Sequence, residues 1–333
     1  MVYRIATIPG DGIGQEVIPA AVQVLGATGV PCEFIPAEAG WATFERQGTA
    51  LPEETIALVR ETGLALFGAV SSPARKVPGY RSPIVALRRE LDLYANLRPA
   101  LSAPIPSSRP GIDLLLVREN TEGLYAGRER RDGETAIAER VITRAASERI
   151  GRLACTLALG RRRHLTIVHK ANILPETCGL FRDTVRAQAA NYPDLRVEEI
   201  LVDTMALRLA LTPEAFDVVV TTNLFGDILS DEAAAFVGGL GLAPAGNIGP
   251  QAAVFEPVHG SAPDIAGRGI ANPTAAILAA AMLLEHVGET EAAHRVRHAV
   301  WRTLAHGPRT PDLGGEATTN EVVAAVITNL ERT

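Results

Sequence analysis

Cysteine is scarce in this 333-residue sequence. The three cysteines, Cys32, Cys155 and Cys178, are an odd number, and none belongs to a CxxC pair or to the spacing of a metal site. This pattern argues against a disulfide framework or a cysteine metal site, and it favours a reducing compartment.

Long apolar runs and an excess of one charge are also missing. The longest apolar run, Ala275 to Leu284, is about half of what spans a bilayer, and the start, MVYRIATIPGDG, has no charged leader before an apolar stretch. The net charge is −6 and the pI about 5.7, with one short basic cluster at Arg161 to His164. We therefore expect a soluble, cytoplasmic protein with no nucleic-acid or membrane partner.

The sequence is rich in short β-branched runs that alternate with amphipathic segments. Hydrophobic residues make up 47% of the chain and the mean hydropathy is +0.13, which predicts a well-filled core. The expected strands are RIATI, ALFGAV, IDLLLV, HLTIV, VEEILV and DVVVTT, and the expected helices cover 15–28, 84–94, 175–190 and 226–237. This order predicts an α/β fold with substantial parallel sheet, whose ligands bind at the carboxyl ends of the strands.

Two segments interrupt this alternation. A proline- and serine-rich segment at 100–111 and a glycine-rich one at 238–250 are candidate crossings between domains. We expect a large domain of 1–99 plus 243–333 and a small domain of 100–242. Within the small domain, the polar segment 126–141 contains an Asp-Gly turn signal and predicts a protruding hairpin.

The GDGIG loop, Gly10 to Gly14, follows the first strand and opens the first helix. Glu33 lies about twenty residues on, where a Rossmann dinucleotide site has its ribose-binding acid. The spacing is G-x-G-x-G rather than G-x-G-x-x-G, however, and a tight strand-to-helix turn needs glycines whatever the ligand.

The stretch NLFGDILSDEAA contains Asp227 and Asp231, four residues apart on a predicted helix. Such side chains lie about 5–6 Å apart on one face and repel, so their charges need compensation. In one interpretation Asp227 lies in the first helical turn, where backbone N–H groups stabilise a carboxylate, and Asp231 is a solvated charge. In the other, both bind Mg²⁺ or Mn²⁺, with Asp203, at the end of VEEILV, as a third acid.

Three arginines, Arg88, Arg98 and Arg118, each lie near a predicted strand or helix end. Guanidinium groups bind carboxylates bidentately, so three of them in one pocket would suit a substrate with two or three carboxylates. Taken singly, each is better explained as a surface ion-pair partner. Arg89 points elsewhere on the same helix as Arg88 and is a natural control.

Two further side chains are candidates for proton transfer. Lys170 ends the strand HLTIVHK, where a buried ammonium beside a cation would have a depressed pKa and could act as a base. Tyr125, seven residues after Arg118, is a possible proton donor. The ordinary interpretations are an exposed strand-end lysine and a packing tyrosine.

Five long motifs together resemble one family. VRENTEGLY, VHKANIL, TTNLFGDILSDEAA, GLGLAPAGNIG and VFEPVHGSAPDIAGRGIANPTAAIL are similar to the metal-dependent β-decarboxylating dehydrogenases that act on isocitrate, 3-isopropylmalate, homoisocitrate and tartrate. The similarity runs from GDGIG to the segment PRTPDLGG and covers nearly the whole chain. It implies a fold that is not Rossmann, with two α/β domains around a cleft, and a homodimer or tetramer with shared active sites.

The resemblance also implies roles for individual residues. Arg88, Arg98 and Arg118 would hold the malate-like part of the substrate, and Asp227 and Asp231 would bind Mg²⁺ or Mn²⁺. The remaining residues that it implies for catalysis are Asp203 of the second subunit as third metal ligand, Lys170 of that subunit as base with Asn172 nearby, and Tyr125 as proton donor after CO₂ leaves. A Lewis-acidic cation suits both oxidation and decarboxylation of a 2-hydroxy acid.

The family pattern in PVHGSAPDIAG places Asp264 at the adenosine ribose hydroxyls, where a carboxylate binds NAD and repels the 2′-phosphate of NADP. Members that prefer NADP tend to have lysine and tyrosine where this chain has Asp264 and Ile265, so NAD is expected. The residues expected around NAD are Ile13, Asn223, His259, Gly260, Ser261, Ala262, Asp264, Ile265 and Asn272.

The substrate is expected to be selected just before Arg88. The run KVPGYRSPIVALRRELDLYANLRP is most similar to homoisocitrate dehydrogenases of the lysine-forming aminoadipate pathway. Valine at position 85 cannot pair with the terminal carboxylate of isocitrate but can contact the extra methylene of homoisocitrate, whose distal carboxylate would reach Ser72 or Arg81. The expected reaction is NAD-dependent oxidative decarboxylation of homoisocitrate to 2-oxoadipate and CO₂.

Alternatives remain at this point. Ile84 and Val85 also form an apolar surface for an isopropyl group, as in 3-isopropylmalate dehydrogenase, although Arg81 stands where those enzymes typically have glutamate. Isocitrate is a further possible substrate. A non-catalytic regulatory subunit would have lost the catalytic tyrosine, lysine or aspartates, and this chain retains all of them.

Overall fold

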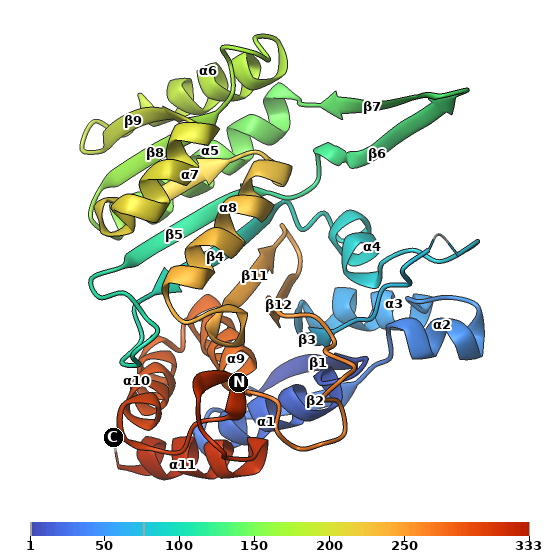
Figure 1. The fold of residues 1–333 in the computed structure, drawn as a ribbon, viewed down its shortest axis with the longest axis vertical. Helices are drawn as coiled ribbons and strands as arrows, with labels where there is room; N and C mark the ends of the chain where they lie inside the picture. Colours follow the sequence, from blue (N-terminus) through green and yellow to red (C-terminus); the bar gives the residue numbers. More distant parts are fainter. Residues whose placement is uncertain (1, 76, 333) are drawn as a thin grey trace. The chain divides into compact units, whose positions relative to one another are not determined.

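A computed structural model describes residues 2–75 and 77–332, and its internal contacts divide the chain into two compact units. Unit 1 comprises Met1–Leu93, Ala103–Ser108 and Gly238–Thr333, and unit 2 comprises Tyr94–Ser102 and Arg109–Val237. The sequence-based boundaries after 99 and 242 lie a few residues beyond these. The helices and strands are labelled in Figure 1.

Unit 1 contains a mostly parallel sheet in the order β2-β1-β3-β12-β11. Its strands are β1 (Tyr3–Gly10), β2 (Cys32–Pro36), β3 (Leu64–Ala69), β11 (Pro244–Ile248) and β12 (Ala253–Pro257), and the β11–β12 pair is antiparallel. Its helices are α1 (Gly14–Ala27), α2 (Trp41–Gln47), α3 (Glu53–Thr62), α4 (Pro83–Glu90), α9 (Thr274–His286), α10 (Thr290–His306) and α11 (Thr319–Glu331). Two 3₁₀ turns, η2 (Leu240–Leu242) and η3 (Pro311–Leu313), complete the unit.

The side chains of β3 alternate between two cores. Leu64 and Leu66 join the cluster of α1, α9, α10 and α11, whereas Ala65 and Phe67 join the cluster of α3 and α4. A strand that is buried on both faces reads as a continuous apolar run, which explains ALFGAV.

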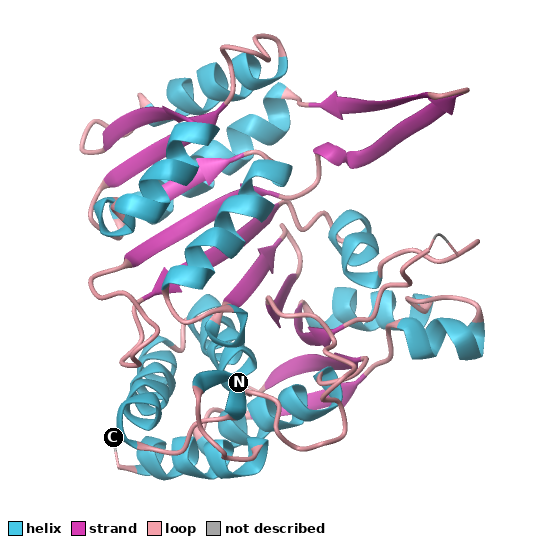
Figure 2. Cartoon of the chain, viewed as in Figure 1, coloured by secondary structure: helices cyan, strands magenta, loops and turns pink. Residues whose placement is uncertain are grey.

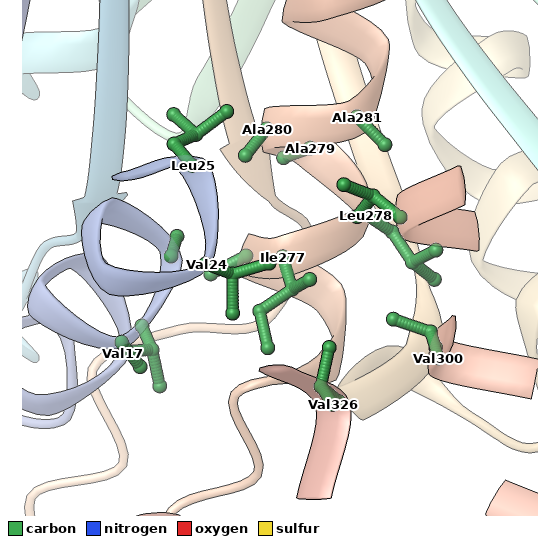
Figure 3. Packing of buried hydrophobic residues seen from close by; sticks show 14 of the residues in the cluster. Val17, Val24, Leu25, Ile277, Leu278, Ala279, Ala280, Ala281, Val300 and Val326 are labelled. Atoms are coloured by element: carbon green, nitrogen blue, oxygen red, sulfur yellow. The ribbon is translucent and has the colours of Figure 1, made fainter. Parts of the chain in front are cut away.

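Helix α9 is the centre of the larger core. It packs against α1, α10, β11 and β12, and it is buried on nearly every side. Ala279, Ala280 and Ala281 allow the neighbouring elements to approach, while Ile277 meets Val24 of α1 and Val326 of α11 (Figure 3). A helix that is apolar all round is a buried one, so its ten-residue apolar run is a core helix.

In unit 2 the strands follow the order β4-β5-β10-β8-β9, in which β4 and β5 are antiparallel and the other pairs parallel. Its strands are β4 (Ala95–Leu101), β5 (Asp113–Glu119), β8 (His164–His169), β9 (Arg196–Leu201) and β10 (Val218–Thr221). Its helices are α5 (Arg144–Leu159), α6 (Thr177–Ala189), α7 (Val202–Leu211) and α8 (Asn223–Phe236), with the 3₁₀ turn η1 (Pro213–Ala215). Helices flank the strands of this unit in Figure 2.

The predicted hairpin is confirmed. Strands β6 (Gly123–Asp132) and β7 (Thr135–Val141) pair antiparallel around a turn at Gly133 and Glu134, directly after Asp132, and most of their residues are exposed. In Figure 1 they project from the rest of unit 2.

Two helix boundaries differ from the predictions by more than two residues. Helix α8 begins at Asn223 rather than Gly226, because Thr222 is extended and directly precedes the first turn. Its first turn contains no acidic residue, so the interpretation of Asp227 as a first-turn carboxylate is wrong. Helix α4 ends at Glu90, not Tyr94, because Asp92 takes a positive φ of 46° and turns Leu93 into the core.

Within the described residues, no helix combines the length and the apolar character needed to cross a membrane.

Candidate active site

Arg118 and Asp227 form the centre of a polar cluster in unit 2. Arg118, near the end of β5, is 1% exposed, and its Nε and Nη2 donate to Asn223 Oδ1 at 2.9 and 2.7 Å. Its Nη1 pairs with the Asp227 carboxylate. Position 226 must be glycine here, because a Cβ would lie 2.7 Å from the Arg118 side chain. The end of β5 and the start of α8 thus hold the buried Arg118 guanidinium against the Asp227 carboxylate.

Tyr125 contacts the same carboxylate. Its hydroxyl donates to the second carboxylate oxygen of Asp227, and its ring lies 5.1 Å from the Arg118 guanidinium. Burial raises the pKa of Tyr125, and the neighbouring Asp227 raises it further. A phenol kept protonated in this way can donate a proton.

Asp231 lies one turn further along α8 and is paired with a different arginine, Arg98. Arg98 Nη1 is 3.3 Å from Asp231 Oδ1, and Arg98 Nε donates to Asn96 Oδ1 at 2.8 Å. Partial burial raises the pKa of Asp231, and Arg98 opposes that rise. The charges of both aspartates on α8 are therefore compensated by arginines, which answers the repulsion expected from their spacing.

Lys170 and Asp203 form a separate ion pair. Lys170 follows β8 and Asp203 is in the first turn of α7, directly after β9, so adjacent strand ends bring them together. The hydrogen bond from Lys170 lowers the pKa of Asp203. Asn172 is exposed two residues after Lys170. Among the described residues, no group of three His, Cys, Asp or Glu side chains has the arrangement of a metal site, so Asp203 does not join Asp227 and Asp231 within one chain.

Arg88, in unit 1, has dedicated buried partners. Its Nε donates to Asn247 Oδ1 at 3.0 Å, its Nη2 lies 3.2 Å from Glu256 Oε1, and Asn247 Nδ2 donates to that same oxygen at 2.7 Å. Ile84 and Val85 are half-buried one turn earlier on α4, whereas Ser72 and Arg81 are exposed in the preceding segment.

A pocket of about 260 Å³ lies between the GDGIG loop and the loops after β12 and α10. Four of the residues expected around NAD line it: Ile13, His259, Ile265 and Asn272. Burial lowers the pKa of His259, and its buried Nε2 has no hydrogen-bond partner among the described residues. Asp264 is exposed beside Ile265.

The GDGIG loop forms a wall of this pocket. Ile13 N donates to Ser261 O at 2.9 Å, and a Cβ at Gly12, whose φ is +55°, would lie 2.0 Å from that oxygen. The glycines thus allow two loops to touch, as the tight-turn interpretation predicts. Across this contact Ala262 takes a positive φ of 38°, uncommon for alanine and typical of loops shaped for a ligand.

Comparison with known proteins identifies the family. A family model described as isocitrate/isopropylmalate dehydrogenase matches residues 4–326. The chain belongs to this family. It is a β-decarboxylating dehydrogenase, and its two α/β units have the corresponding fold.

Individual relatives carry different substrate names. The isocitrate/homoisocitrate dehydrogenase of Thermus thermophilus is 63% identical over 332 residues, 99% of both chains. The 3-isopropylmalate dehydrogenase of Methanothermobacter thermautotrophicus is 50% identical over 98% of both. The crystal structure of isocitrate dehydrogenase from Methylococcus capsulatus superimposes with a TM-score of 0.94 at 46% identity, covering 98% of this chain and 99% of that one.

Several pocket residues of this dehydrogenase escaped the sequence analysis. Gly241, Ile270, Pro311 and Asp312 also line the pocket. Asp312 accepts from Asn272 Nδ2 at 2.9 Å, forty residues away in sequence. The PRTPDLGG segment was the available signal, because it marks the end of the family resemblance. Asn247 and Glu256, the partners of Arg88, also lay within quoted motifs but had no assigned role.

Proposed function

We propose that this dehydrogenase converts homoisocitrate to 2-oxoadipate and CO₂ with NAD and a divalent cation, a step of lysine biosynthesis. The observation that carries the substrate choice is Val85, an apolar, half-buried side chain one turn before the substrate arginine candidate Arg88. The relative at 63% identity is named for both isocitrate and homoisocitrate, so its name agrees with homoisocitrate as a substrate and leaves the preference to the assay.

The chemistry of the α8 carboxylates fits Mg²⁺ or Mn²⁺. Asp227 and Asp231 offer hard oxygen ligands four residues apart, and such cations bind one or two protein carboxylates and complete their shell with water or substrate oxygens. Asp203 of a second subunit would supply the third carboxylate. When bound, the cation polarises the oxygens of the substrate as a Lewis acid.

The pocket of unit 1 fits the adenosine part of NAD. Its lining is mostly apolar, and the unpaired His259 Nε2 offers a polar contact. The exposed Asp264 carboxylate would accept hydrogen bonds from both ribose hydroxyls and would repel a 2′-phosphate. The volume of about 260 Å³ suits one part of a dinucleotide rather than the whole.

The side chains divide the proton transfers between them. Arg88, Arg98 and Arg118 bind substrate carboxylates, and their partners hold each guanidinium in one orientation. Lys170, oriented by Asp203, would remove the proton of the 2-hydroxyl, and a bound NAD would supply the acceptor for the hydride of C2. Tyr125, whose phenol is protonated at neutral pH, returns a proton to C3 of the enol after CO₂ departs.

The exposed apolar residues of unit 2 support a homodimer. Leu207, Leu211 and Ile228 are each about 60% exposed, and they lie on α7 and α8, which pack together. Burying these helices against a second copy would bring Asp203 of α7 toward Asp227 of the other chain. Lys170 would then also act across the interface.

One assay tests the proposal. The rate of NAD reduction should be highest with homoisocitrate, lower with isocitrate and 3-isopropylmalate, and should vanish when EDTA removes the divalent metal. Val85→Arg should raise kcat/KM for isocitrate relative to homoisocitrate, because the guanidinium can pair with the terminal carboxylate, and Val85→Ala is the matched control. Equal or better kcat/KM for isocitrate in the parent enzyme would exclude the proposal.

A second candidate substrate is 3-isopropylmalate. Ile84 and Val85 together form an apolar surface that could receive an isopropyl group, and a relative at 50% identity carries that name. The same assay separates the two candidates, because a preference for 3-isopropylmalate would assign the enzyme to leucine biosynthesis.

A further inference from the structure

The aspartate of the GDGIG loop, Asp11, has no part in the chemistry above, yet its carboxylate is buried and hydrogen-bonded. Asp11 is 7% exposed, and its carboxylate accepts three backbone N–H groups: Trp41 at 2.6 Å, Ala42 at 3.0 Å and Ser71 at 2.9 Å. Trp41 and Ala42 begin α2, and Ser71 begins the segment 71–82 that leads to α4. One carboxylate therefore joins a helix start to a loop start.

Gly40 makes this arrangement possible. It has a φ of +117°, and a Cβ there would lie 2.4 Å from an Asp11 carboxylate oxygen. An L side chain at position 40 would therefore displace Asp11 from its three donors.

Segment 71–82 has two further anchors. Ser71 Oγ donates to Ser261 Oγ at 2.8 Å, in the loop that forms the nucleotide pocket, and the Tyr80 hydroxyl donates to Ser71 O at 2.8 Å. The Tyr80 ring packs edge-on against Trp41 and Phe44 of α2, with centroids 5.4 Å apart in both pairs. Tyr80, near the end of the segment, is thus hydrogen-bonded to Ser71 at its start, and the Tyr80 ring packs on α2.

We propose that Asp11, Ser71 and Tyr80 are positioning residues that hold residues 71–75 and 77–82 in one conformation and so preform the surface that meets the group on C3 of the substrate. The inference rests on the proposed function and on the sequence-based expectation that the distal carboxylate of the substrate reaches Ser72 or Arg81. A loop that is already fixed loses less conformational entropy when it binds, so the anchors strengthen binding without touching the substrate.

A merely structural role predicts something different. If the anchors only stabilise the fold, their loss should lower the unfolding temperature and weaken every ligand alike. If they position this segment, their loss should weaken the binding of acids with a C3 substituent. The binding of malate, the shared core that has no such substituent, should not change.

Tyr80→Phe is the most conservative test, because it removes the bond to Ser71 and keeps the ring on α2. We expect KM for the best C3-substituted acid to rise about 3- to 10-fold, the effect of one neutral hydrogen bond, with kcat nearly unchanged. The competitive inhibition constant of malate should stay within about twofold. Tyr3→Phe is the matched control, since it also removes a tyrosine hydroxyl bond in unit 1, to Glu289, and should change neither constant.

Asp11→Asn should have the larger effect, because it replaces an acceptor of charge-assisted bonds by a group with one donor side. We expect KM for the substituted acid to rise about 10- to 100-fold, and Asp11→Ser should not restore it. If Asp11→Asn does not fold, Tyr80→Phe alone decides.

The inference would be overturned if the affinities for malate and for the substituted acid fell equally, or if Tyr80→Phe left KM for the substituted acid unchanged. The substituted acid used in these assays is whichever of homoisocitrate, isocitrate or 3-isopropylmalate the parent enzyme binds best. The test therefore remains valid if the preferred substrate differs from homoisocitrate, and that failure shows up separately, in the parent assay.

Discussion

The proposed nucleotide pocket of unit 1 and the cluster of Arg118, Asp227 and Asp231 in unit 2 are built in opposite ways. The pocket is assembled within one chain from backbone contacts, glycines and apolar side chains, and the buried His259 Nε2 has no partner in the part of the chain that the structure describes. In the cluster, Asp227 and Asp231 are already paired with arginines, and Asp203 is paired with Lys170 elsewhere. The pocket is preformed for a ligand, whereas the acids must exchange partners to bind a cation.

The arginines show the same contrast. Arg88 is paired with Glu256, which has no proposed role in metal binding, so its orientation does not depend on the metal. Arg118 and Arg98 are paired with the proposed metal ligands, so a cation that draws Asp227 and Asp231 away also frees these guanidinium groups for substrate carboxylates. Binding of metal and substrate should therefore be strongly linked in unit 2.

The largest effect should come from removing the Lys170 amine or the Asp227 carboxylate, which the proposed dimer brings together from two subunits. Lys170→Met and Asp227→Asn should each lower kcat about 100- to 10,000-fold, since each removes a group that acts on the reacting atoms. When the two inactive variants are unfolded together and refolded, activity should return to about one quarter of the parent value, because half of the dimers are mixed and one site in each is intact.

Mixing Lys170→Met with itself is the control for that experiment. If mixing with Asp227→Asn restores nothing although mixed dimers form, Lys170 and Asp227 act within one chain, and the contrast between a self-contained pocket and a shared cluster fails.

A smaller effect is expected at Arg88. Arg88→Lys should raise KM about 10- to 100-fold, because an ammonium cannot bind Asn247, Glu256 and a carboxylate with one planar group. Arg89→Lys, on the exposed side of α4, should change KM less than about twofold. Steady-state kinetics on both variants decides, and similar KM values in the two would remove Arg88 from the site.

The pocket should respond more mildly still to a change at its rim. Asp264→Lys combined with Ile265→Tyr should raise the NADP-to-NAD ratio of kcat/KM about tenfold, because the exposed position is screened by solvent. Asp264→Asn alone should weaken NAD with little gain for NADP. An unchanged ratio in the double variant would place the ribose away from Asp264.

The smallest effect concerns pH. Burial lowers the pKa of His169, so its neutral form contributes stability that is present above about pH 6.5, its usual unfolded pKa, and is lost as the pH falls through the lowered folded value. His169→Asn keeps an acceptor for the Ala171 N–H and removes this titration. Its melting temperature should fall less between pH 7.5 and 5 than that of the parent. An equal fall would show that other groups dominate.

The alternation of strands and helices followed from the sequence because period and turn residues are local. The same holds for the hairpin, whose Asp-Gly turn signal is explicit. The start of α8 was placed three residues late, although Thr222, of a residue type favoured at N-cap positions, directly precedes Asn223. The wrong first-turn interpretation of Asp227 came from that single boundary.

The candidate site was readable where one motif carries it. Asn223 and Asp227 share one stretch, and Arg118 and Tyr125 share another. Contacts between distant segments were not readable: Asp11 with Ser71, Arg88 with Glu256, and Asn272 with Asp312. Tertiary folding alone brings these pairs together, because neither partner has a local pattern that names the other.

Helix α9 has a consequence for how this enzyme can diverge. Its alanines meet strands and helices on nearly every side, so larger residues have no room there and the helix must stay as it is. Asn272, just before it, accepts the Thr274 N–H with its side chain and lines the proposed nucleotide pocket. New specificities must therefore arise in the exposed loop positions around this fixed helix, where a changed side chain leaves the core untouched and few substitutions separate one coenzyme or acid from another.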